Sequence, residues 1–183
     1  MPEPDTRVSG APPAGRITLK GDLAGLADPV RAVTGAGLPD PLRFVEGEGG
    51  RAAWMAPDEL LLTVPPDALP AVLEELEAGL AGRHALVADV SDARAGFVLE
   101  GAGARDVLAK TTPIDLRRAS FGPGAFRRTR MGQVAAALAC LRDDRMEVLV
   151  FRSVAAYAEG LLQTAADPRA PLGLHERPAD ARS

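Results

Sequence analysis

The sequence contains one cysteine, Cys140, so an internal disulfide framework is excluded and a reducing compartment is favoured. The residues around it, AAALACLR, are mostly apolar and predict a small buried side chain rather than a reactive thiol. Histidine is nearly as scarce, because only His84 and His175 occur and neither has a cysteine at ligand spacing. We therefore expect no transition-metal site and a cytoplasmic location.

Long hydrophobic runs are missing as well. No apolar stretch approaches the roughly 20 residues that a membrane-spanning helix needs, and the N-terminus, MPEPDTRVSGAPPAGR, lacks the apolar segment of a signal peptide. Aromatic residues make up 4% of the chain, so the core must consist mainly of Leu, Val and Ala. The net charge of −4 argues against a nucleic-acid-binding protein that relies on overall attraction. We expect a soluble protein without membrane or nucleic-acid partners.

Proline is frequent at both ends of the chain. Residues 1–15 contain four prolines and few large apolar residues, and residues 167–183 contain Pro168, Pro171 and Pro178. This composition is typical of flexible tails, which can also wrap a neighbouring subunit. Residues 16–166 are expected to form a single α+β domain.

Periodicity within residues 16–166 predicts both strands and helices. Alternating or continuous apolar runs of four to nine residues favour strands, and apolar residues at spacings of three and four favour helices. Strands are expected over 17–21, 42–46, 52–55, 59–64, 86–90, 97–100, 125–131, 133–141 and 146–151. Helices are expected to begin after the N-cap candidates Asp22, Asp67 and Ser153 and after Gly103.

The two halves of the chain have similar patterns. DELLLTVPPDALPAVLEEL and RMEVLVFRSVAAYAEGLL both read as a strand, a short break and an apolar-striped helix. ITLKG and FVLEG are both strands followed by a helix. We therefore predict a duplicated strand-helix-strands-helix unit, with pseudo-repeats at 16–82 and 85–166 and helices packed on antiparallel sheets.

Three polar features are candidate sites. Gly101-Ala102-Gly103-Ala104 follows a strand and opens a helix, but it lacks a third glycine and a βαβ context, so it indicates a structural turn rather than a phosphate cradle. Asp89, Ser91 and Asp92 are either a carboxylate pair for acid-base work or a backbone-capping turn. Asp115, taken alone, is an ordinary loop carboxylate. None has a neighbouring histidine, so no nucleophilic catalytic set is predicted.

Arginines gather in the loop and strand that follow Asp115. The functional interpretations are docking to an acidic protein surface and holding a carboxylated cofactor. Protein docking fits the pattern about as well as an ordinary solvated loop and strand face does. The interface candidates are Arg117, Arg118, Arg127, Arg128 and Arg130.

Several short motifs, in order between Arg16 and Leu162, resemble those of a known family. Asp89-Val90-Ser91, Gly101, Ala104, Leu108 and Asp115 resemble a pattern in the folate-binding domain of aminomethyltransferases, the T-proteins of the glycine cleavage system. A closer resemblance is to the gamma subunit of heterotetrameric sarcosine oxidase. It rests on WMAPDELL (54–61), the D-V-S-D turn, VLAK with P-x-D-L (107–116) and R-S-x-A-x-Y (152–157).

The resemblance implies a subunit of an enzyme complex. The complex would oxidise sarcosine to glycine, with hydrogen peroxide and either formaldehyde or methylene-tetrahydrofolate as products. FAD, FMN, NAD and tetrahydrofolate would belong to the complex, and none of them to this chain. The partners would be a large alpha subunit, a beta subunit and a small zinc-binding delta subunit.

The chain departs from the aminomethyltransferase pattern where catalysis would occur. Ile114 precedes Asp115, where the family has Asn, and the apolar run AAALAC replaces later acidic residues of the family. Asp89 and Asp115 are therefore expected to be remnants of an ancestral folate site, and this chain to have no catalytic residues. The alternatives are a stand-alone folate-dependent aminomethyltransferase-like enzyme that uses Asp115, and a generic protein-docking module that uses the arginines.

Overall fold

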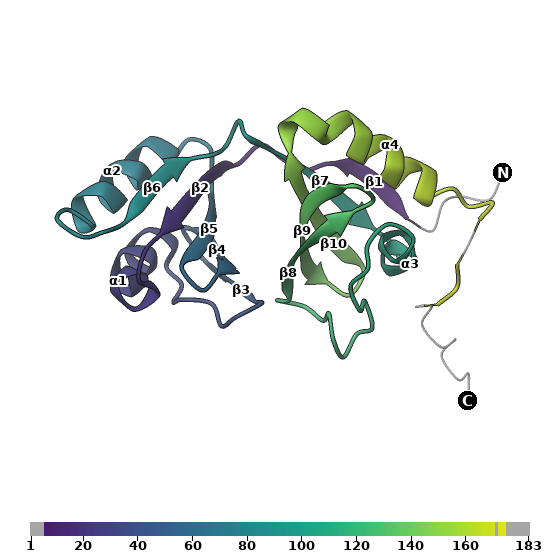
Figure 1. Ribbon diagram of the computed structural model, residues 1–183, viewed down its shortest axis with the longest axis horizontal. Helices are drawn as coiled ribbons and strands as arrows, with labels where there is room; N and C mark the ends of the chain where they lie inside the picture. Colours follow the sequence, from purple (N-terminus) through teal and green to yellow (C-terminus); the bar gives the residue numbers. More distant parts are fainter. Residues whose placement is uncertain (1–5, 171, 175–183) are drawn as a thin grey trace. The chain divides into compact units, whose positions relative to one another are not determined.

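The computed structural model describes residues 6–170 and 172–174, and the chain within it forms two compact units (Figure 1). The N-terminal unit is Pro12–Arg94, and the C-terminal unit combines the described parts of Met1–Ala11 and Ala95–Ser183. His175 and the ends of the two expected tails, residues 1–5 and 175–183, lie outside the described residues.

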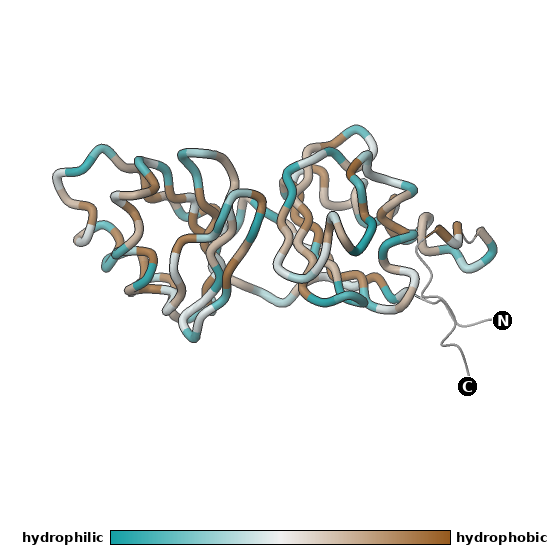
Figure 2. The backbone as a smooth tube through the Cα atoms, turned by 90° about the horizontal axis from the view of Figure 1, so that it is seen from below, coloured by the Kyte–Doolittle hydropathy of each residue, from teal (hydrophilic) through white to brown (hydrophobic). Residues whose placement is uncertain are grey.

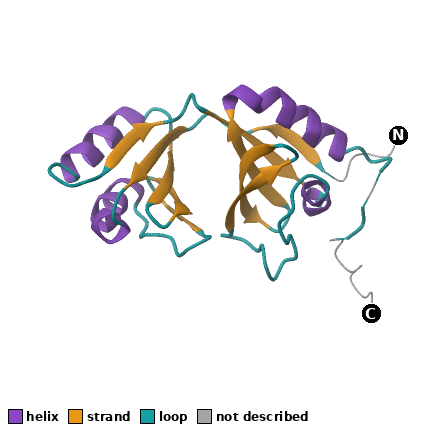
Figure 3. Ribbon diagram, viewed as in Figure 1, coloured by secondary structure: helices purple, strands orange, loops and turns teal. Residues whose placement is uncertain are grey.

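The N-terminal unit is a sheet with two helices on one face (Figure 3). Its helices are α1 (Leu23–Thr34) and α2 (Leu69–Gly79), which contact each other. Its strands are β2 (Gly15–Lys20), β3 (Phe44–Gly47), β4 (Gly50–Ala56), β5 (Glu59–Val64) and β6 (Leu86–Asp89). They pair antiparallel in the order β3-β4-β5-β2-β6.

The C-terminal unit has the same design. Its helices are α3 (Ala104–Ala109) and α4 (Ala155–Ala165), with a 3₁₀ turn, η1 (Arg152–Val154), before α4. Its strands are β1 (Arg7–Gly10), β7 (Arg94–Glu100), β8 (Phe126–Met131), β9 (Val134–Arg142) and β10 (Arg145–Phe151). Their order is β1-β7-β10-β9-β8.

The two sheets match strand for strand, so the predicted α+β fold with a duplicated unit is confirmed. In each sheet, one strand (β2 or β7) lies between the last strand of a three-stranded antiparallel meander (β5 or β10) and an edge strand (β6 or β1). β6 pairs with β2 in one sheet, and β1 occupies the equivalent edge beside β7 in the other.

The edge strands are where the structure differs from the sequence-based boundaries. Residues 7–10 form β1, although the whole of residues 1–15 was expected to be a tail. β6 pairs with β2 and so belongs to the N-terminal unit, although the second repeat was expected to begin at residue 85. Both strands are four residues long and are held by partners far away in the sequence, which local periodicity does not reveal.

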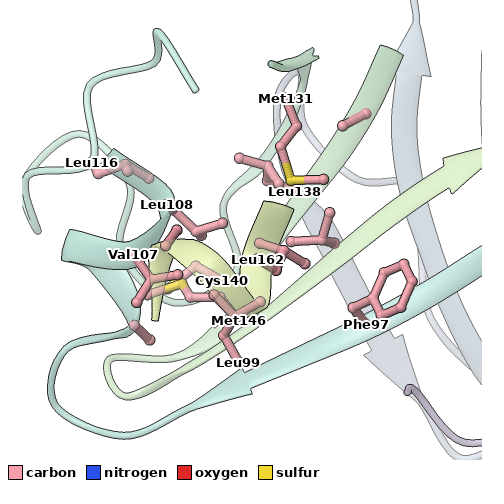
Figure 4. Close-up of a cluster of buried hydrophobic side chains, with 14 of the residues drawn as sticks. Phe97, Leu99, Val107, Leu108, Leu116, Met131, Leu138, Cys140, Met146 and Leu162 are labelled. Atoms are coloured by element: carbon pink, nitrogen blue, oxygen red, sulfur yellow. The ribbon is translucent and has the colours of Figure 1, made fainter. Parts of the chain in front are cut away.

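Each unit has its own hydrophobic core between its sheet and its helices. In the C-terminal unit, Leu138 and Cys140 of β9 point toward Leu108 of α3 and Leu162 of α4, and all four are fully buried (Figure 4). In the N-terminal unit, Ile17 of β2, Leu60 of β5 and Leu76 of α2 are fully buried in a separate core. Hydrophobic and hydrophilic stretches follow one another along the backbone of both units (Figure 2).

The helix starts were predicted to within about one residue, but the predicted N-cap side chains do not make capping hydrogen bonds. Asp22 occupies the N-cap of α1 but makes no side-chain capping hydrogen bond. The caps of α2 and α4 are Ala68 and Val154, each one residue after the predicted Asp67 and Ser153. The reason is that a turn closed by Ala68 N–H to the Pro65 carbonyl, and the η1 turn, come before these helices. No helix in the described part of the chain is long and apolar enough to cross a membrane.

Candidate functional site: two acidic turns and a basic loop

Asp89 lies at the end of β6 and closes a local turn. Its Oδ1 accepts hydrogen bonds from the backbone N–H of Ser91 at 2.9 Å and from the Ser91 hydroxyl at 2.6 Å. The Ser91 Oγ in turn accepts the backbone N–H of Arg16 at 2.9 Å, which fixes the start of β2. These hydrogen bonds, chiefly that from the Ser91 hydroxyl, lower the pKa of Asp89. The geometry is that of an Asx turn that ties β6 to β2.

Asp115 organises a second turn, at the start of a long loop. Its Oδ1 accepts the backbone N–H of Arg117 at 3.0 Å, and its Oδ2 accepts the Arg117 Nη2 and the Ser120 hydroxyl, both at 2.6 Å. The hydrogen bond from the Arg117 side chain is the main reason why the pKa of Asp115 lies well below its usual range. Both carboxylate oxygens are therefore engaged within the loop itself.

A buried arginine holds the same loop from inside the C-terminal unit. The Arg105 side chain, on α3, is 1% exposed. Its Nη1 donates to the backbone carbonyls of Leu116 and Phe121, both at 2.7 Å. The side chains of Leu116 and Phe121 are themselves buried in the core. The guanidinium therefore satisfies two loop carbonyls that the adjoining secondary structure leaves without a donor.

Asp143, in the turn between β9 and β10, links Arg105 to the exposed part of the loop. Its Oδ1 accepts the Arg105 Nη2 at 3.0 Å and the Arg118 Nη1 at 3.1 Å. The Arg105 Nη2 also lies 3.6 Å from the Cys140 Sγ, whose pKa is raised, mainly by burial. The Arg105 Nε is buried and has no hydrogen-bond partner among the described residues, so the guanidinium is held by its two Nη groups.

The five arginines of the predicted interface fall into two groups. Arg117, Arg118 and Arg127 lie around residues 115–121, since the Arg127 Nη2 donates to the Ser120 carbonyl at 3.0 Å. Arg128 and Arg130 are exposed on the edge strand β8, and strand alternation puts them on one face and Arg127 on the other. The structure thus brings three of the five together.

The glycine turn before α3 has a structural role. Gly101 N–H donates to the Asp144 carbonyl at 2.8 Å, and the carbonyls of Gly101 and Gly103 accept the N–H groups of Ala104 and Val107 in α3. α3 has only six residues. The turn therefore links β7 to the β9–β10 turn and starts a short helix.

One hollow of about 670 Å³ lies in the N-terminal unit, where β2 and β5 meet the start of β6. It is lined by Lys20, Gly21, Asp22, Leu23, Pro57, Asp58, His84, Ala85 and Leu86. Lys20 pairs with Glu59 at 3.3 Å, and the lining mixes acidic, basic and apolar groups, so it does not single out a class of ligand. The described residues contain no group of three or more His, Cys, Asp or Glu that could hold a metal ion.

Sequence reasoning found Asp89, Asp115 and the exposed arginines but missed Arg105 and Asp143. Arg105 stands in GARDVLAK beside Asp106, and a pair of charged residues at the start of a helix has the pattern of an ordinary solvated helix position. No local signal marks it, because the carbonyls that it binds lie 11 and 16 residues further along the chain.

The two acidic residues do not fit a folate site. The oxygens of Asp115 are bound by Arg117 and Ser120, and Asp89 is bound by Ser91. A carboxylate with such a low pKa is a weak base at neutral pH. We therefore derive no folate chemistry from this chain.

Comparisons with known proteins place the fold in a family. The family model described as "Sarcosine oxidase, gamma subunit family" matches residues 20–167. The chain is 38% identical over 74 residues to the sarcosine oxidase subunit gamma of Corynebacterium sp. (strain U-96), a stretch that spans 40% of this chain and 35% of that protein.

Solved structures agree with that match. The chain is similar to one in the heterotetrameric sarcosine oxidase from Corynebacterium sp. U-96 in complex with pyrrole 2-carboxylate. The TM-score is 0.80 at 26% identity, over 91% of this chain and 86% of the other. Aminomethyltransferase T of the glycine cleavage system from Bartonella henselae shares the fold, with a TM-score of 0.62 at 19% identity over 88% of this chain and 46% of that one. The resemblance noted from the sequence is confirmed: the chain belongs to the sarcosine oxidase gamma subunit family.

Proposed function

We propose that this chain is the non-catalytic gamma subunit of a heterotetrameric sarcosine oxidase. The observation that carries the proposal is the family match over residues 20–167, on a fold whose candidate acidic residues are hydrogen-bonded within turns. The Asp89 and Asp115 carboxylates fix the backbone, which is a structural task. The role of the chain is then packing and assembly.

In this proposal the complex oxidises sarcosine with molecular oxygen to glycine and hydrogen peroxide. The methyl carbon leaves as formaldehyde or passes to tetrahydrofolate. FAD, FMN, NAD and tetrahydrofolate bind to the other subunits, which are a large alpha subunit, a beta subunit and a small zinc-binding delta subunit. The complex works in the cytoplasm, in line with a chain that has a single buried cysteine.

The interface residues proposed for assembly are arginines of the C-terminal unit, namely the exposed Arg117, Arg118, Arg128 and Arg130 and the half-buried Arg127. Arginine suits such a role because its planar guanidinium can donate two parallel hydrogen bonds to one carboxylate and can stack on neighbouring side chains.

Ligand titration of the isolated full-length chain tests the non-catalytic part of the proposal. FAD, FMN and tetrahydrofolate are added separately in a calorimeter, with Asp115→Asn as the matched variant. We expect no stoichiometric binding of any of them. Tight tetrahydrofolate binding that Asp115→Asn abolishes would instead support the stand-alone aminomethyltransferase-like enzyme.

A further inference from the structure

The N-terminal unit is inserted between two neighbouring strands of the C-terminal unit. It spans Pro12–Arg94, so β1 comes before it in the chain and β7 runs on from its last residue. In the C-terminal sheet, β1 and β7 pair antiparallel along the whole of β1 (Figure 1). The backbone N–H of Ala11 extends the pairing with a hydrogen bond to the Gly96 carbonyl, at 2.8 Å. The two ends of the insert are therefore joined by a strand pair, which we call the β1–β7 clasp.

The clasp is a small part of the C-terminal sheet. β1 is an edge strand of four residues. Its one large apolar side chain, Val8, is half-buried against the C-terminal core and lies opposite Leu99 of β7. A short edge strand with a single apolar anchor opens more readily than the central strands of a sheet. A substitution at Val8 can therefore open the clasp while the rest of the C-terminal sheet stays paired.

Within the insert, hydrogen bonds hold the first and last segments together. The Arg16 N–H donates to the Ser91 hydroxyl at 2.9 Å, and the Arg16 carbonyl accepts the Val90 N–H at 2.8 Å. The antiparallel pairing of β2 with β6 continues this contact, beginning with Ile17 opposite Asp89. The folded insert thus holds its own two ends side by side, as the clasp requires.

The connections between the clasp and the insert have little slack. Residues 11–14 join β1 to β2, and Pro12 and Pro13 lie in the middle of them. Each proline fixes φ at about −65° and has no N–H, which favours an extended segment over a hairpin that would fold β1 back onto β2. At the other end, Arg94 is both the last residue of the insert and the first residue of β7.

Closing a chain into a loop stabilises the structure within the loop, because the unfolded segment then has fewer conformations. While the clasp is closed, an unfolded insert would have to form one long loop between β1 and β7. The folded insert already has its ends together and meets that constraint without further ordering. The clasp therefore lowers the entropy of the unfolded insert and leaves that of the folded insert almost unchanged.

We propose that the β1–β7 clasp is a conformational device that stabilises the N-terminal unit by closing it into a loop, although β1 belongs to the C-terminal sheet. The stabilisation cannot exceed the strength of the clasp itself, since the strand pair opens once the loop strains it. This task needs no other subunit, so the inference does not depend on the proposed function.

Hydrogen exchange of the full-length chain, followed at single amides by NMR, measures the effect in the native state. The Leu61 and Leu62 amides report on β5, the middle strand of the N-terminal sheet, and the Ala11 amide reports on the clasp. Val8→Asp places a carboxylate against the C-terminal core. We expect exchange at least about tenfold faster at Ala11 and at least about fivefold faster at Leu61 and Leu62. Faster exchange at Ala11 alone would overturn the proposal.

Val134→Asp is the matched control. Val134, on β9, is also half-buried against the C-terminal core, so the same substitution weakens that unit outside the clasp. We expect it to change the exchange of Leu61 and Leu62 by less than about twofold. Equal acceleration by Val8→Asp and Val134→Asp would contradict the proposal, because the N-terminal unit would then respond to any loss of C-terminal stability.

A cysteine pair tests the opposite sign within one molecule, and decides the matter even where Val8→Asp does not fold. Ser9 and Val98 are partners across the clasp, and directly opposite residues of antiparallel strands lie within reach of a disulfide. In Ser9→Cys/Val98→Cys, we expect the oxidised form to exchange at Leu61 and Leu62 at least about fivefold more slowly than the reduced form. Equal rates in the two forms would show that loop closure does not stabilise the insert.

Discussion

Arg105 shows how one side chain can organise a loop that carries no regular structure. Burying a guanidinium is costly unless its hydrogen-bonding groups are satisfied. Here two backbone carbonyls and the Asp143 carboxylate accept from its two Nη groups. The favourable contacts are local to residues 105–143, so the effect of losing them should be concentrated in the C-terminal unit.

Replacing Arg105 with Met should therefore destabilise the protein substantially. The Leu116 and Phe121 carbonyls would be left buried without a donor, at about 1–3 kcal/mol each. Some of that loss is recovered by relaxation of the loop, so we expect about 2–4 kcal/mol in urea unfolding. Arg169→Ala, at an exposed ion pair, should leave the stability almost unchanged. Equal, small effects of the two substitutions would contradict the role given to Arg105.

The lowered pKa of Asp115 predicts that the stability of the fold depends on pH in a specific way. Its pKa is lower in the folded chain than its unfolded value of about 3.9. The stabilisation by its ionised form is therefore fully present above about pH 4–5 and is lost as the pH falls below that unfolded value. We expect wild type to be more stable than Asp115→Asn at pH 7, and the difference to shrink toward pH 2.5.

Urea unfolding at several pH values between 7 and 2.5 measures this difference. Asp167, whose pKa is lowered to about 2 by the Arg169 side chain, provides an internal comparison, because Asp167→Asn should follow the same trend. A difference between wild type and Asp115→Asn that stays constant down to pH 2.5 would show that the carboxylate does not titrate as the hydrogen bonds require.

At the scale of elements, the close contact between α1 and the β3–β4 hairpin depends on glycine. Gly49 N–H donates to the Thr34 carbonyl at the end of α1. A Cβ at Gly47 would overlap that same carbonyl oxygen and would meet the backbone at Gly35 and Ala36. The segment GEGG thus both turns the hairpin and lets the helix end approach it.

Gly47→Ala should cost about 2 kcal/mol or more, since backbone atoms cannot move aside as a flexible side chain does. Gly160→Ala is the matched control, because Gly160 lies within α4 and has open space around its Cα. That substitution should stabilise by about 0.5–1 kcal/mol, through the higher helix propensity of alanine. Thermal unfolding of the two variants checks both signs, and a neutral Gly47→Ala would refute the close contact.

The elements with strong local patterns were predictable from the sequence. The continuous run Glu59–Val64 is β5 with the predicted bounds, and the apolar stripe after Leu69 is α2. The strand β1 was not predictable, because Val8 is its only large apolar residue and its partner lies on β7. At the candidate site, the sequence marked Asp115 and the arginines that follow it as candidates, because charged residues gather there. Arg105 and Asp143 could not be found in this way, because they meet only through the tertiary fold.

At the scale of the whole molecule, the chain combines a duplicated α+β fold with membership of the sarcosine oxidase gamma subunit family. The fold is shared with an aminomethyltransferase T, yet the acidic residues of this chain are held in turns. A shared fold therefore does not fix the function, because stability depends on the cores and function on a few side chains.

The direct test of assembly is native mass spectrometry of the complex purified through a tag on this chain in its own host. We predict one copy of this chain together with one copy each of a large, a medium and a small zinc-containing subunit, in a particle that oxidises sarcosine and contains flavin. Recovery of the chain alone or as a homo-oligomer, with folate-dependent turnover of its own, would contradict the account.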